Sequence, residues 1–290
     1  MGILLLGSAA GCRAPDAGVV PSSSRATPTP TEGAFRAPPA LPAPEALPRA
    51  AGQPTIATDW CVAGLAALDE ETCYFLPAET DAGAAPPLLV YLHGIIPPTR
   101  ESPQKERVEL AVLHAAKRAG AAALVPRGVR GIGPGAARDW WAWPTEPGAY
   151  AKYAVSLVAK WGDARRRLEQ ISGAPFARTY LAGSSNGAYF LTTLALTGDL
   201  DRFGFPVDGY GAMSGGSAGG RGAASLPALG RPFYVGYGSY DESTRSSSRA
   251  LAGLLMRAGW PTRSTELPVG HGAREEYLDD AFAFWAEAAQ

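Results

Sequence analysis

The stretch that decides the fold is Arg178-Thr-Tyr-Leu-Ala-Gly183-Ser184-Ser185-Asn186-Gly187-Ala188-Tyr189-Phe190. It begins with a short apolar run, passes through a Gly-x-Ser-x-Gly pentapeptide centred on Ser185, and continues into an apolar, helix-compatible run. A sharp strand-to-helix turn of this kind holds its serine in a strained conformation, and small residues on either side let the turn close. The stretch therefore predicts a nucleophilic Ser185 at a sheet edge, near the electropositive N-terminus of the next helix.

The pentapeptide alone is weak evidence, because the chain contains a second match centred on Ser217. With 35 glycines in 290 residues, chance matches are expected. The sequence after Ser217 is Ala-Gly-Gly-Arg-Gly, which is a poor helix former. We therefore predict that Ser217 lies in a loop.

Short apolar runs alternate with longer amphipathic runs on both sides of Ser185. The predicted strands are 73–76, 88–92, 122–125, 179–182, 209–213, 233–237 and 264–267. The predicted helices are 104–118, 149–171, 187–196, 243–258 and 274–289. Near-continuous apolar strands separated by helices predict an α/β fold, with a mostly parallel sheet covered by helices on both faces.

In this order the features resemble the α/β-hydrolase superfamily, whose catalytic triad runs nucleophile, acid, histidine along the chain. His271 is the only histidine after Ser185, and it lies between the last predicted strand and the last predicted helix. Asp241 follows the penultimate predicted strand, with Glu242 as the alternative. The resemblance implies that His271 is the general base and that Asp241 orients it.

The run Leu88-Leu-Val-Tyr-Leu-His93-Gly94-Ile95 resembles the superfamily's strand that ends in His-Gly. The resemblance implies an oxyanion hole formed by the backbone N–H groups of Ile95 and Asn186. On this interpretation His93 is structural and is not the base. His114, in an Ala-rich predicted helix, is expected to be a packing or surface residue.

The segment from Arg127 to Trp143 resembles the polyhydroxybutyrate depolymerase and feruloyl esterase-like branch, which has an Arg/Gly loop followed by a tryptophan cluster. The resemblance implies that Trp140, Trp141 and Trp143 bind an acyl or aromatic group. The alternative is that these side chains are core packing. Residues 214–231 are a short Gly-rich segment where relatives often insert a cap, so we expect no large cap domain.

Residues 1–12 are an apolar stretch ending in Cys12, which resembles the end of a bacterial lipoprotein signal. This predicts lipidation of Cys12 and an exported, envelope-attached or secreted protein. Residues 13–53 are rich in Pro, Ala, Ser and Thr and predict a disordered tether, followed by the hydrolase domain at 54–290. The alternative is an ordinary N-terminus.

The remaining cysteines, Cys61 and Cys73, predict a disulfide in an oxidising compartment, worth about 3 kcal/mol, with two buried thiols as the alternative. No His or Cys pair has zinc-ligand spacing, so we predict no metal site. The serine-hydrolase hypothesis also implies that no cofactor is needed.

Charge and hydropathy narrow the possible partners. The net charge is −1 and only 18% of residues are charged, which argues against nucleic-acid binding. No apolar run approaches the about 20 residues that span a bilayer, so membrane contact is expected only through Cys12.

The implied function is a serine-dependent hydrolase of small-molecule or polymeric carboxylic esters. A serine peptidase of the same fold and a non-catalytic binding protein on a hydrolase scaffold are the alternatives.

Overall fold

The computed structural model describes residues 58–77, 85–99, 101–227 and 230–290. The expected signal segment, its Cys12 and the expected tether at 13–53 lie outside these residues. The strands are β1 (Ala66–Asp69), β2 (Thr72–Phe75), β3 (Leu88–Leu92), β4 (Ala122–Pro126), β5 (Thr179–Ser184), β6 (Gly209–Met213), β7 (Phe233–Gly238) and β8 (Thr262–Leu267). The helices are α1 (Pro103–Ala119), α2 (Pro147–Ser172), α3 (Asn186–Thr197), α4 (Asp199–Arg202), α5 (Arg245–Arg257) and α6 (Glu275–Ala288), with short 3-10 turns η2 (Gly135–Ala137) and η3 (Ala223–Ser225).

The strands form one eight-stranded sheet in the order β1-β2-β4-β3-β5-β6-β7-β8. The six strands from β4 to β8 in this order are parallel, while β1 and β2 pair antiparallel at one edge. The carboxyl ends of the parallel strands therefore share one edge of the sheet, which is where loops of such sheets carry ligands. The predicted mostly parallel sheet is confirmed.

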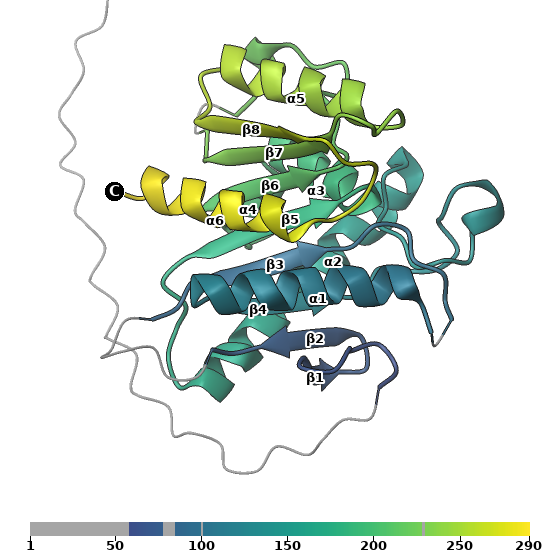
Figure 1. Ribbon diagram of the computed structural model, residues 1–290, viewed down its shortest axis with the longest axis vertical. Helices are drawn as coiled ribbons and strands as arrows, with labels where there is room; N and C mark the ends of the chain where they lie inside the picture. The colour runs from purple at the N-terminus through teal and green to yellow at the C-terminus, as the bar shows by residue number, and fades with distance from the viewer. Residues whose placement is uncertain (1–57, 78–84, 100, 228–229) are drawn as a thin grey trace, which may run out of the picture. The chain divides into compact units, whose positions relative to one another are not determined.

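Alternating side chains of β3 show why both sheet faces need a cover. Leu88, Val90 and Leu92 join a core with α2, α3 and α5 on one face. Leu89 and Tyr91 join a second core with α1 and α6 on the other face. Figure 1 shows α1 and α6 in front of the sheet and α2 and α3 behind it. The prediction of helices on both faces is confirmed.

The predicted strands and helices end within two residues of the observed ones, but β1 and α4 were not predicted. In β1 only Leu68 is buried, so this edge strand lacks the apolar run that marks the fully buried strands β3 and β4. Between β6 and β7 the described residues contain only η3, in agreement with the absence of a large cap. The longer insertion lies between β4 and α2, and it projects beyond the carboxyl ends of the strands in Figure 1.

Within the described parts of the chain, no helix combines the length and the apolar character needed to cross a membrane.

Candidate active site

The predicted nucleophile lies in the tight turn between β5 and α3. Ser185 has φ 52° and ψ −120°, a conformation that L-residues rarely adopt. The turn closes because its neighbours are glycines: a Cβ on Gly187 would lie 2.3 Å from the carbonyl oxygen of Leu92, and one on Gly183 would lie 2.7 Å from the same atom. The small residues of the pentapeptide are therefore required by the close passage of β3.

The structure brings Ser185, Asp241 and His271 together from three loops at the carboxyl ends of β5, β7 and β8. His271 Nε2 lies 3.0 Å from Ser185 Oγ, and His271 Nδ1 lies 2.9 Å from Asp241 Oδ2. The order Ser185, Asp241, His271 along the chain and these two contacts match the serine, acid and histidine pattern of a catalytic triad. Glu242, the alternative acid, is exposed on the same loop.

Asp241 is buried in a ring of hydrogen-bond donors. Its Oδ1 accepts hydrogen bonds from Ser243 Oγ at 2.7 Å and from the N–H groups of Ser243 and Thr244 at 3.1 Å, and its Oδ2 accepts one from Thr244 Oγ1. Burial raises the pKa of the Asp241 carboxyl, but the hydrogen bonds from Ser243, Thr244 and His271 outweigh it and bring the pKa down to about 2.

The ionised Asp241 settles the tautomer of His271. A carboxylate only accepts hydrogen bonds, so the Nδ1 that contacts it carries the proton. Neutral His271 then presents an unprotonated Nε2 to the Ser185 hydroxyl, which is the arrangement that a general base needs.

His93 has no part in this relay. Its ring is fully buried, Nε2 accepts a hydrogen bond from the Gly128 N–H at 2.9 Å, and Nδ1 donates to the carbonyl oxygen of Gly94. Burial and the nearby Arg127 lower the pKa of His93 to about 4, against the opposite effect of the Gly94 bond. A neutral imidazole thus fixes the backbone of the loop after β3.

That loop passes directly beside the nucleophile, because a Cβ on Gly94 would lie 3.2 Å from Ser185 Cβ. The Gly94 carbonyl is held by His93, and the Ile95 carbonyl accepts a hydrogen bond from Gln104 Nε2 at 2.7 Å. The N–H of Ile96 donates to the carbonyl of Trp141 at 3.0 Å.

Of the four polar groups in the two peptides that flank Ile95, three are thus bonded. The Ile95 N–H has no acceptor among the residues that the structure describes.

The second expected oxyanion donor is the N–H of Asn186, the first residue of α3. A helix leaves its first N–H groups without intrahelical acceptors. The Asn186 side chain is used elsewhere: its Oδ1 accepts from the Trp143 N–H at 2.6 Å, and its Nδ2 donates to the Trp143 carbonyl at 3.2 Å. These bonds join the nucleophile turn to the insertion after β4.

The three tryptophans of this insertion differ in exposure. Trp143 is 1% exposed, donates from Nε1 to the His93 carbonyl at 2.8 Å and stacks on Phe190, so the prediction that it binds substrate is wrong. It is a core residue, as the alternative interpretation held. Trp141 is half-buried beneath the Arg127 guanidinium, whose carbon lies 4.1 Å from the ring centre. Trp140 is exposed.

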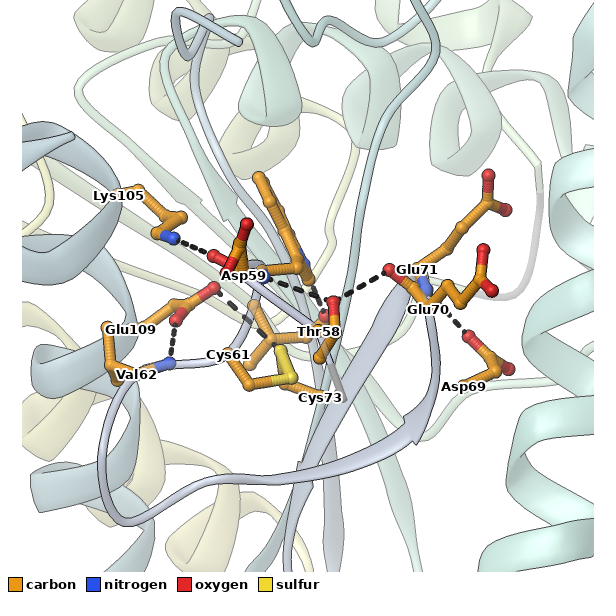
Figure 2. The surroundings of a disulfide bond; sticks show 12 residues. Thr58, Asp59, Cys61, Val62, Asp69, Glu70, Glu71, Cys73, Lys105 and Glu109 are labelled. Carbon is orange, nitrogen blue, oxygen red and sulfur yellow. Dashed lines mark hydrogen bonds between the residues drawn. A yellow bond between two sulfur atoms is a disulfide. The ribbon is translucent and has the colours of Figure 1, made fainter. Parts of the chain in front are cut away.

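Cys61 and Cys73 form a disulfide that joins the segment before β1 to β2. Figure 2 shows this bond beside Glu109 of α1, which accepts a hydrogen bond from the Val62 N–H at 2.8 Å. Trp60, the residue before Cys61, packs its ring 5.2 Å from that of His93. The disulfide therefore anchors the segment of Trp60 and Cys61, which contacts His93 at the end of β3.

Sequence reasoning missed two side chains near the site, Gln104 and Ser214. Gln104 lies on the first turn of α1, and no motif in the sequence indicates that it contacts the site. Ser214 directly follows β6, next to the glycines of the second pentapeptide, and its hydroxyl contacts Gly272. Ser217 lies in a loop, and His114 is on the surface beside Glu275, as expected.

Among the described residues, no group of three or more His, Cys, Asp or Glu side chains is placed to hold a metal ion.

The sheet order and the serine turn define the α/β-hydrolase fold. Solved structures similar to the chain include esterase PE8, with a TM-score of 0.51 and 21% identity over 74% of this chain and 97% of that one. Another is the α/β hydrolase LAE6 from the metagenome of Lake Arreo, Spain, with a TM-score of 0.51 and 16% identity over 76% and 78%. A carboxylesterase from Bacillus cereus has a TM-score of 0.50 and 16% identity over 78% and 95%.

No family model matches the sequence, and no curated protein matches it either. The similar structures therefore establish the fold, and the chemistry has to be argued from the site itself.

Proposed function

We propose that the protein is a serine-dependent carboxylic ester hydrolase. The observation that carries the proposal is the relay in which His271 lies 3.0 Å from Ser185 and 2.9 Å from Asp241. A nucleophile activated in this way attacks an acyl carbon and forms a covalent intermediate.

In the acylation step, Ser185 Oγ bonds to the ester carbonyl carbon while its proton moves to His271 Nε2. The carbonyl oxygen becomes an oxyanion, and the N–H groups of Ile95 and Asn186 donate to it. Collapse of this intermediate breaks the bond to the alcohol oxygen, which takes the proton from His271 and leaves as the alcohol.

Deacylation repeats the sequence with water as the nucleophile. His271 takes a proton from water, the oxygen bonds to the acyl carbon, and Ser185 leaves with the proton returned from His271. The products are a carboxylic acid and the free enzyme. None of these steps calls for a cofactor.

The surroundings favour esters that reach an open surface. Ser185 is half-buried and the His271 side chain is 41% exposed. Exposed Trp140 and half-buried Trp141 are the proposed contacts for the acyl or alcohol group of a small or polymeric ester. We also propose that the protein is exported and attached to the cell envelope through Cys12.

The test is fluorophosphonate labelling of the full chain, followed by hydrolysis of p-nitrophenyl esters. Wild-type protein and a Ser217→Ala variant, which changes the serine of the second pentapeptide, should label and turn over alike. Ser185→Ala should do neither. A folded wild-type protein that does not label would reject the proposal in favour of a binding protein on a hydrolase scaffold. Labelling with hydrolysis of peptides but not of esters would instead establish a serine peptidase.

A further inference from the structure

Ser214 stands out in the backbone of the molecule. It is fully buried directly after β6 and has φ 45°. Among the described residues, the only other non-glycine residue with a positive φ is Ser185, the proposed nucleophile. A left-handed conformation is unfavourable for a residue with a Cβ, so the surrounding structure has to hold Ser214 in place.

The hydroxyl of Ser214 bonds to both backbone groups of Gly272. Ser214 Oγ donates to the Gly272 carbonyl at 2.9 Å and accepts from the Gly272 N–H at 3.2 Å. Gly272 is the residue immediately after His271. One side chain therefore fixes the backbone that carries the proposed base.

The same short segment also contacts the nucleophile. The carbonyl of Met213 accepts a hydrogen bond from the Ser185 N–H at 3.0 Å. A Cβ on Gly215 would lie 2.7 Å from the carbonyl oxygen of Ser185, so residue 215 packs directly on the nucleophile turn. Ser214 is itself fixed by its N–H, which donates to the carbonyl of Gly236 in β7 at 2.8 Å.

We propose that Ser214 is a positioning residue that sets His271 against Ser185. The inference rests on the proposed function, because it assigns Ser214 to the same relay. Among the described residues, the His271 ring is held at its two nitrogens only by Asp241, Ser185 and the more distant Ser243, and much of its side chain faces solvent. The loop that carries His271 therefore has to be fixed through its backbone. The Ser214 hydroxyl, at the end of β6, does this through its two bonds to Gly272.

Two variants separate the hydroxyl from the backbone strain. Ser214→Ala removes both hydrogen bonds and keeps the unfavourable conformation, whereas Ser214→Gly removes the bonds and relieves the strain. We expect kcat for a p-nitrophenyl ester to fall about 5- to 20-fold in both variants, with KM within about twofold, because a loosened base lowers the fraction of reactive geometries. Ser214→Gly should melt at a higher temperature than Ser214→Ala.

The second readout is amide hydrogen exchange at Gly272, whose N–H loses its acceptor in both variants. We expect faster exchange there than in wild-type protein, and unchanged exchange in Ser217→Ala, the control in the same β6–β7 connection. Wild-type kcat in the two Ser214 variants would overturn the proposal, as would unchanged exchange at Gly272. A kcat that recovers in Ser214→Gly along with its stability would also overturn it, because the effect would then follow strain and not the hydroxyl.

These outcomes differ from a failure of the proposed function. If wild-type protein turns over esters while the variants match it, only the role of Ser214 is refuted. If wild-type protein neither hydrolyses esters nor reacts with fluorophosphonate, the proposed function is refuted. The exchange rate at Gly272 then still decides whether Ser214 holds the loop.

Discussion

Glu109 and Asp241 are both buried carboxyl groups, but their surroundings shift their pKa values in opposite directions. Burial raises the pKa of Glu109, on the side of the disulfide, to about 7, against the smaller effects of the Val62 N–H and of Lys105. Asp241, on the side of β7 and β8, has its pKa lowered to about 2 by its hydroxyl and imidazole donors, despite burial. The difference lies in the number of hydrogen bonds that reach each carboxyl.

The contrast parallels the two roles that we propose around Ser185. The side of the proposed oxyanion donor Ile95 is fixed by packing: Trp60 lies against His93, and the disulfide of the neighbouring Cys61 joins this segment to β2. A donor that stabilises charge in a transition state has to be in place before the reaction. The side of the proposed base is held by hydroxyl hydrogen bonds around Asp241, which keep its charge in place and leave His271 accessible for the proton transfers that we propose.

The largest expected effect lies on the base side. Asp241→Asn should lower kcat/KM for a p-nitrophenyl ester by up to about 10⁴-fold, because the amide no longer selects the His271 tautomer that presents a bare Nε2 to Ser185. Glu242→Gln, on the same loop, is the matched control and should leave kcat/KM unchanged. A near-native rate in Asp241→Asn, with a large loss in Glu242→Gln, would move the acid role to Glu242.

The next largest expected effect concerns Glu109, near the disulfide, and the pH dependence of the free energy of unfolding. A pKa of about 7 in the folded state, above that of an unfolded glutamate, means that Glu109 stabilises the fold fully below about pH 4.5. This contribution, on the order of 3 kcal/mol, is lost as the pH rises through 7. Urea unfolding of Glu109→Gln across this range should lack that slope.

Glu106→Gln, an exposed position on the same helix, should keep the wild-type slope. An identical pH dependence in wild-type protein and Glu109→Gln would show that Glu109 ionises in the folded state as readily as in the unfolded one.

Removing the disulfide comes next in size. Cys61 and Cys73 are 12 residues apart in sequence, and closing such a short loop is worth about 3 kcal/mol at most, with engineered cases often smaller. The Cys61→Ala/Cys73→Ala double variant should melt at a lower temperature than oxidised wild-type protein. Reductant should lower the melting temperature of wild-type protein and leave that of the double variant unchanged. Equal melting temperatures with and without reductant would show that the bond contributes no stability.

The smallest expected effect concerns the substrate. Trp140→Ala should raise KM for an aromatic or long-chain ester about threefold, with kcat and stability unchanged, because an exposed ring contributes contact area and little else. Val155→Ala, an exposed apolar position on α2, is the control and should not change KM. An unaltered KM across a panel of acyl chains would remove Trp140 from the binding surface.

The sequence predicted β3 to β7 well because every residue of these five strands is buried and most of the residues are apolar or glycine. The edge strand β8 has no buried residue, and its predicted start was two residues late. The sequence also placed Ser185, Asp241 and His271 in order, since glycines and strand ends mark the loops that carry them. It misassigned Trp143, because a tryptophan in a loop has the same appearance in sequence whether its ring faces solvent or lies against His93 and Phe190.

The contacts of Ser214 and Gln104 could not be predicted from the sequence for a related reason. Their contacts with Gly272 and Ile95 join segments that are 58 and 9 residues apart, and neither residue type is unusual where it stands. Contacts of this kind depend on which strands become neighbours, and that information appears only once the sheet is assembled.

The strand order also separates the two partners of the proposed relay within the sheet. The nucleophile turn follows β5 in the middle of the sheet, whereas its proton acceptor follows β8, the last strand of the chain and the edge of the sheet. His271 is translated after Ser185, so the proposed nucleophile has its proposed base only once β8 has joined the sheet.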